Sequence, residues 1–173
     1  MTPLGAARIA TAASLLAAAV WLGGLVVLGA IVAPIVFHEV TAPMSADAMT
    51  HVFLRFDRVA LVALTVVGVA EAVAARSAPP RTWPERIRLA SVALAGVLAV
   101  VQALWLSPAI AELHAGGAIR GLGPMGDALE VMHRRSELCG KTEVVLLVSF
   151  LALSAFRRFE PEKFRRGESA TPA

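Results

Sequence analysis

The stretch at residues 130–158, EVMHRRSELCGKTEVVLLVSFLALSAFRR, decides how the chain has to fold, because it begins charged and ends apolar. Its uncharged part, residues 144–156, is shorter than the roughly 20 residues that a helix needs to cross a membrane. A span here must therefore include charged residues. Glu137, Lys141 and Glu143 then lie at or inside the membrane boundary, where a charge costs several kcal/mol unless it is shielded. We expect neighbouring helices to supply that shield.

The composition favours a small membrane protein. Of its 173 residues, 57% are hydrophobic and 17% are charged. Such a chain is too apolar for a soluble domain. The net charge of +3 does not indicate a nucleic-acid partner, because the basic residues form short clusters at the ends of apolar runs. The single cysteine, Cys139, excludes an internal disulfide.

Four apolar runs predict an all-α integral membrane bundle of four transmembrane helices, antiparallel and up-down. We place one membrane domain at residues 1–158, with spans at about 9–37, 51–76, 86–111 and 130–157. Residues 159–173 form a charged tail that we expect to be flexible and cytoplasmic. The first run is longer than the apolar region of a signal peptide, so we expect it to be retained as a span.

The basic residues also predict the orientation. Most of them flank the spans on the side that holds both termini: Arg8, Arg76, Arg81, Arg86, Arg88, Arg157, Arg158, Lys163, Arg165 and Arg166. The positive-inside rule makes that side cytoplasmic. We therefore expect an integral protein of a bacterial-type inner membrane, with both termini in the cytoplasm.

Three polar residues inside the spans have expected roles. Trp21 lies near the middle of the first span, and we expect it to point into the bundle. Gln102, in the third span, should hydrogen-bond to a neighbouring helix. Glu71 has two interpretations: a pair with a basic residue of the following loop, or an intramembrane acid on a proton or ion path.

All four histidines, His38, His51, His114 and His133, fall at the outer ends of the spans. In an antiparallel bundle they gather at one mouth, and imidazole is a common ligand of zinc, copper and iron. The E-x-x-H of Glu130 and His133 matches half of a di-iron carboxylate site, but the second half is missing. A metal ion or a haem at this mouth is therefore one interpretation.

The competing interpretation is a charged network. Side chains of opposite charge on the second and fourth spans can neutralise one another and hold the helix ends together. The candidates are Arg55, Asp57, Glu130, Arg134, Glu137 and Lys141. No nucleophile has an adjacent base in a recognisable motif, so the sequence does not favour an enzyme.

Four segments, VAPIVFHEV, HVFLRFDRVALV, ALWLSPAIAELHAG and MHRRSELCG, carry a family resemblance. In order and spacing they resemble the landmarks of the transmembrane protein 205-like family, also catalogued as domain of unknown function 4149. The matching residues are Pro34, Phe37, Phe53, Phe56, Ala103, Leu104, Trp105, Pro108, His133 and Ser136. Members often have an asparagine where this chain has Gly140.

The resemblance implies a four-span membrane protein without an established biochemical activity. An animal member is linked to tolerance of a platinum drug, so the resemblance retains soft and borderline metal ions as candidate ligands. A fainter similarity, through tryptophan and glycine in the first span and the outer histidines, runs to the copper-resistance D membrane domain and serves as analogy only.

Three hypotheses of function follow. The first is binding or transport-related handling of a metal ion or small cation at the outer His, Asp, Glu and Arg cluster. The second is electron transfer by a haem with two histidines as axial ligands. The third is a structural or assembly subunit whose Ala and Gly faces serve oligomerisation. Copper, zinc and haem are the candidate cofactors. The expected partners are the lipid bilayer, a metal ion and a second copy or membrane complex, but not nucleic acid.

Overall fold

The structure, a computed structural model, describes residues 3–77 and 82–159. Apart from Phe159, the expected tail lies outside the described residues. The described residues are almost entirely helical and contain no strand. The elements in order are α1 (Pro3–Val27), η1 (Leu28–Val32), α2 (Ala33–Glu39), α3 (Met44–Ser77), α4 (Trp83–Val101), η2 (Gln102–Leu106), α5 (Ser107–Ala115) and α6 (Gly123–Phe159).

These elements form four helices long and apolar enough to cross a membrane, because η1 and η2 are π-helical turns that join their flanking helices without a break. The candidate spans are Gly5–Glu39, Met44–Arg76, Trp83–Ala115 and Gly123–Phe156. The prediction of an all-α bundle with four membrane-length helices is confirmed, and each helix extends beyond the span expected from the sequence. The chain is a multi-pass membrane protein.

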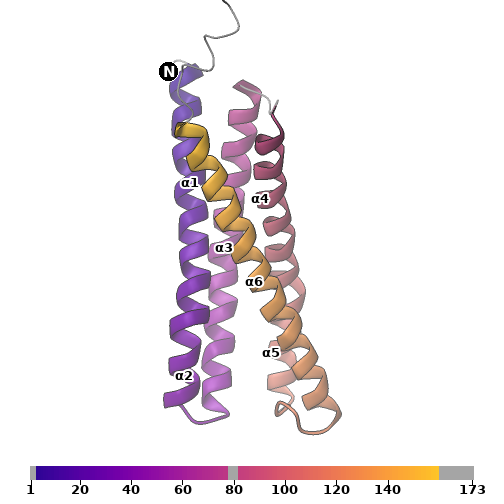
Figure 1. Ribbon diagram of the computed structural model, residues 1–173. Helices are drawn as coiled ribbons and strands as arrows, with labels where there is room; N and C mark the ends of the chain where they lie inside the picture. Colours follow the sequence, from indigo (N-terminus) through magenta and orange to yellow (C-terminus); the bar gives the residue numbers. More distant parts are fainter. Residues whose placement is uncertain (1–2, 78–81, 160–173) are drawn as a thin grey trace, which may run out of the picture.

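The four helices form a ring in which α1 packs on α3 and α6, and α4 packs on the same two helices. Figure 1 shows the start of α1 and the end of α6 at one end of the bundle, which we call the terminal end. The turns after α2 and α5 lie at the opposite end, which we call the hairpin end. Helix α6 crosses obliquely, so that it meets α5 near the hairpin end and α1 towards the terminal end (Figure 1).

Two prolines explain where the π-helical turns occur. Pro34 and Pro108 lie just after η1 and η2, and residue 30 or 104, four positions before each proline, falls inside the turn. A proline offers no N–H to that carbonyl, and its ring crowds it. A π-helical turn re-routes the backbone around such a defect. The helix therefore passes through Pro34 and stops at Glu39.

The apolar core lies between the middle of the bundle and its terminal end. Its buried members are Ala18, Trp21, Ala60, Ala63, Val67, Val92, Ala95, Ala99, Leu147 and Phe150. Alanine and glycine allow the helix backbones to approach one another closely, as expected in lipid. The Phe56 ring, for example, occupies the space in which Gly24 would carry a side chain, and Leu64 packs in the same way on Gly96.

Candidate functional site

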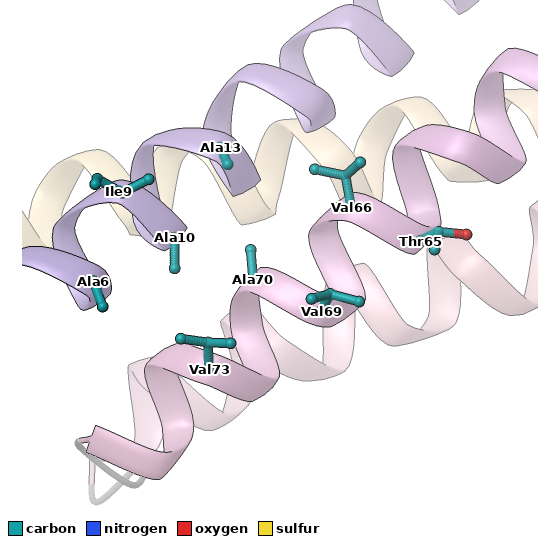
Figure 2. Close-up of a pocket in the computed structure, with 9 residues that line it drawn as sticks. All are labelled: Ala6, Ile9, Ala10, Ala13, Thr65, Val66, Val69, Ala70 and Val73. Carbon is teal, nitrogen blue, oxygen red and sulfur yellow. The ribbon is translucent and has the colours of Figure 1, made fainter. Parts of the chain in front are cut away.

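An apolar groove of about 450 Å³ lies between α1 and α3. Figure 2 shows its lining, with small alanine side chains of α1 opposite valines of α3. Thr65 contributes a hydroxyl, but that group donates to the Leu61 carbonyl across 2.8 Å. The groove therefore offers no free polar group that could bind or react with a polar ligand, although it is larger than the cavity described next.

A smaller cavity of about 60 Å³ lies in the middle of the bundle, and four of the side chains that line it are polar. Asp57 of α3, Gln102 of η2, and Ser136 and Glu143 of α6 contribute the polar side chains. A water molecule takes about 30 Å³ in the liquid, so the cavity has room for at least two. Chemistry inside the bundle is possible here because polar groups and space for water coincide.

Glu143 is buried in the bundle, with an exposed fraction of 2%. The indole Nε1 of Trp21, itself fully buried, donates a hydrogen bond to Glu143 Oε2 across 3.2 Å. An indole N–H carries no charge, so this bond orients the carboxyl group without neutralising it.

Asp57 is the second buried acid, with an exposed fraction of 7%. Its side chain lies close enough to interact with Ser107 at the start of α5. Its Oδ2 atom is buried and has no hydrogen-bond partner among the described residues. A buried polar atom without a partner costs free energy, so this oxygen needs a donor or a cation.

Gln102 connects the two sides of the cavity. Its Nε2 donates to Ser107 Oγ across 3.0 Å and to Ser136 Oγ across 2.8 Å, which confirms the expected hydrogen bond to a neighbouring helix. Both amide hydrogens are thereby used. Its Oε1 atom is buried and, like Asp57 Oδ2, finds no donor in the described part of the chain. Two oxygen acceptors around one cavity are thus left without a donor.

The cavity lies far from both ends of the bundle. Each of its polar side chains lies at least 13 residues from either end of its candidate span, as from Met44 to Asp57, from Gln102 to Ala115 and from Glu143 to Phe156. At 1.5 Å per residue this is about 20 Å of helix. Asp57 and Glu143 lie close enough to interact electrostatically. No basic side chain lines the cavity in the described ranges.

Comparison with known proteins connects this architecture to a family. A family model described as Domain of unknown function (DUF4149) matches residues 16–118. The chain belongs to this DUF4149 family. The matched region includes Trp21, Asp57, Gln102 and Ser107 and ends before Ser136. No curated protein and no solved structure matches the chain. The transmembrane protein 205-like name and the similarity to the copper-resistance D domain stay predictions.

This DUF4149 protein has a second buried polar cluster, near the terminal end, and it is compensated. Arg88 donates from Nη1 and Nη2 to the two carboxylate oxygens of Glu71, across 2.8 and 2.7 Å. Ser14 adds a hydrogen bond of 2.8 Å, and the Arg88 guanidinium lies 5.2 Å from the centre of the Phe150 ring. Of the two interpretations of Glu71, the structure shows the basic partner, which comes from the start of α4. A bidentate pair of this kind leaves Glu71 little freedom to carry ions.

The histidines of the DUF4149 chain do not form one site. His114 and His133 come together, with ring centres 5.7 Å apart, and Thr50 Oγ1 lies 3.0 Å from His114 Nδ1. His38 is exposed beside Glu39, with an exposed side-chain fraction of 85%, and His51 is exposed on α3. In residues 3–77 and 82–159, no three His, Cys, Asp or Glu side chains are placed to hold a metal ion. The expected gathering of four rings is therefore reduced to one pair.

The expected charged network is likewise divided. Glu130 binds Arg120 and, across 3.0 Å, Arg134. The pair with Glu130 raises the pKa of Arg120, so this guanidinium stays charged.

Glu137 binds Lys141 one turn along α6, across 2.6 Å, on an exposed face. Arg55 is exposed on α3, whereas Asp57 is turned into the cavity. Asp57 is therefore not part of a salt-bridged mouth, because the helix directs it towards the bundle interior.

The sequence did not predict that the cavity residues lie close together. The signals were separate: Glu143 needed a shield, Trp21 was expected to face inwards, and Gln102 was expected to bond to another helix. Nothing in the sequence indicated that these three side chains and Asp57 approach the same point. Ser107, Ser136 and Ser14 were not singled out as partners of buried polar groups, since serines are common on the faces of membrane helices.

Proposed function

We propose that this DUF4149 protein binds a small cation in the cavity between Asp57 and Glu143 and passes it through the bundle. One observation carries the proposal. Asp57 Oδ2, an oxygen of a buried acid, has no partner among the described residues and faces a cavity that a second buried acid also lines. Two acids without a basic neighbour in an apolar bundle are costly, and a bound cation removes that cost.

The proposal keeps the small-cation hypothesis but moves the site from the outer mouth to the middle of the bundle. The described residues bring only two histidines together at the hairpin end, whereas the cavity combines acids, acceptor oxygens and space. Intramembrane acids that face the bundle interior mark ion paths in many membrane proteins. We further propose that both termini are cytoplasmic in a bacterial-type inner membrane, because basic residues cluster at the terminal end.

Cation flux into proteoliposomes tests the function. Full-length protein is reconstituted, and the entry of H⁺, Na⁺ and K⁺ is followed with ion-selective dyes. We expect flux above that of protein-free vesicles, and its loss in Asp57→Asn and in Glu143→Gln. The matched control is Glu137→Gln, which removes an exposed acid of α6 and should leave flux unchanged. Flux at the protein-free level for all three cations would overturn the proposal and favour the scaffold hypothesis.

The orientation is tested separately. Reporter domains fused to the C-terminus and inserted in the turn at residues 116–122 are assayed for activity on each side of the membrane. We expect a cytoplasmic C-terminus and an external turn. A cytoplasmic turn would contradict the orientation without affecting the cavity.

A further inference from the structure

We infer that the cation bound in this cavity is a proton, held between Asp57 and Glu143 through water. The inference rests on the proposed function, since it names the ion for the same site. It follows from three features of the cavity: the number of free oxygen ligands, the direction of its hydrogen bonds, and the composition of its walls.

The free ligands are too few for a coordinated metal ion. Asp57 Oδ2 and Gln102 Oε1 are the buried acceptors without a partner among the described lining residues. Glu143 Oε2 already accepts from Trp21, which leaves Oε1 of that carboxyl group as a third oxygen, and both serine hydroxyls accept from Gln102. Calcium takes six to eight oxygen ligands and magnesium needs a near-octahedral set. A proton needs only an oxygen on either side of it.

The hydrogen bonds around the cavity leave oxygen acceptors that still need a hydrogen-bond donor. The Gln102 amide donates both of its hydrogens to serine oxygens, so its own oxygen is left towards the cavity as an acceptor. An ionised carboxylate is an acceptor only, whereas a protonated one donates through its O–H. One proton on the acid pair, together with one or two waters, therefore supplies the donors that Asp57 Oδ2 and Gln102 Oε1 lack.

The walls contain no competing charge among the described residues. The groups that face the two acids are the Trp21 indole from α1, the Gln102 amide and Ser107 hydroxyl from η2 and α5, and the Ser136 hydroxyl from α6. Cys139, a neutral thiol of α6, interacts electrostatically with Glu143. Like charges in one site resist being ionised together. A single shared proton therefore leaves one negative charge in the cavity instead of two.

The transfer step conserves charge and atoms. Protonated Glu143 gives its hydrogen to a water oxygen while that water gives one of its own hydrogens to Asp57 Oδ2. Glu143 then carries the negative charge, Asp57 is neutral, and the water is unchanged. On the terminal side the cavity borders the apolar core, with Val67, Leu147 and Phe150 buried. Leu106 and Leu129 are buried on the hairpin side as well, so proton entry and proton release both require the packing around the cavity to open.

Infrared spectra and ion selectivity together test the inference. The carbonyl stretch of a protonated carboxyl group is recorded for the full-length protein in lipid at neutral pH. We expect that band in the wild type and its loss in the double variant Asp57→Asn with Glu143→Gln, because burial still favours the protonated form of the acid that remains in either single variant. We also expect proton flux that is independent of Na⁺ and K⁺.

A third variant separates cavity filling from loss of an acid. Gly140 lines the cavity, and a Cβ placed there meets no atom within 4 Å. Gly140→Leu therefore fills the space for water while both acids remain. We expect proton flux to fall to the level of protein-free vesicles. The matched control is Gly23→Leu on α1, which also has open space but faces away from the bundle, and whose flux should be unchanged.

The outcomes distinguish the two proposals. Flux that requires Na⁺ or K⁺, with no protonated carboxyl band, would overturn the proton and leave the cation function standing. Absence of flux for every cation would overturn both. Normal proton flux in Gly140→Leu, with a correctly folded protein, would exclude the water-filled cavity as the path.

Discussion

Trp21 Nε1 lies 3.2 Å from Glu143 Oε2, so the first and last helices of the bundle are joined at mid-length by a buried hydrogen bond. The two residues are 122 positions apart in the chain. Both side chains are buried, which makes the bond a fixed point of the fold, and Glu143 also lines the cavity.

Trp21→Phe tests that bond. The variant keeps an aromatic ring but leaves a buried carboxylate oxygen without its donor, which typically costs about 1–3 kcal/mol. We expect a lower midpoint of thermal unfolding in detergent. Trp105→Phe, at an exposed position, is the matched control and should unfold like the wild type. Equal losses in the two variants would show that ring size, rather than the hydrogen bond, matters.

The Glu71 and Arg88 pair is expected to contribute strongly to stability. Glu71→Gln leaves the Arg88 guanidinium buried without its counter-charge, a change that costs roughly 3–5 kcal/mol in buried ion pairs. Denaturant titration of the purified protein measures the loss. Glu137→Gln breaks an exposed ion pair and should leave stability nearly unchanged. A double variant, Glu71→Gln with Arg88→Met, should lose less than the sum of the two single variants.

Gly24 is expected to tolerate no side chain, because the Phe56 ring fills the space where a Cβ would stand. Gly24→Ala forces the ring to move and should cost about 1–3 kcal/mol, as overpacking of cores does. At Gly23, its neighbour in sequence, an added Cβ would meet nothing within 4 Å. Gly23→Ala should therefore be neutral or stabilising by up to about 1 kcal/mol. Unfolding temperatures that are alike for the two variants would contradict this packing.

Near neutral pH, the ion pairs at the hairpin end should respond to salt rather than to pH. Glu130 raises the pKa of Arg120, so the stability that this pair contributes is complete below the ordinary arginine value and lost only above the raised one. We therefore expect no loss of stability from deprotonation of Arg120 near neutral pH. Added salt screens exposed charges, and the unfolding temperature of wild type should approach that of Arg120→Ala as salt rises.

One outcome of the Arg120→Ala comparison would contradict the expected effect of salt. A gap between the two unfolding curves that persists at high salt would mean that Arg120 acts through packing of its aliphatic stem, since long basic side chains also cover apolar surface.

Much of the fold was predictable because it depends on local properties of the chain. Apolar runs of membrane length predicted four helices, and the structure has four helices of that length among its described residues. Less of the site was predictable. The Glu71 pair was one of two alternatives, and the structure brings two of the four histidines together instead of all four.

By itself, the sequence determined that this protein has four membrane-length helices and that Glu143 needs a shield, because hydropathy and helix length follow from consecutive residues. Only the tertiary structure decided that Asp57, Gln102 and Glu143 come together around one cavity and that Trp21 bonds to Glu143. Periodicity shows which residues share a face of one helix, but not how that helix is rotated against its neighbours. The π-helical turn at Gln102–Leu106 shifts that rotation further, and the resulting alignment places two acids and a glutamine around the same cavity.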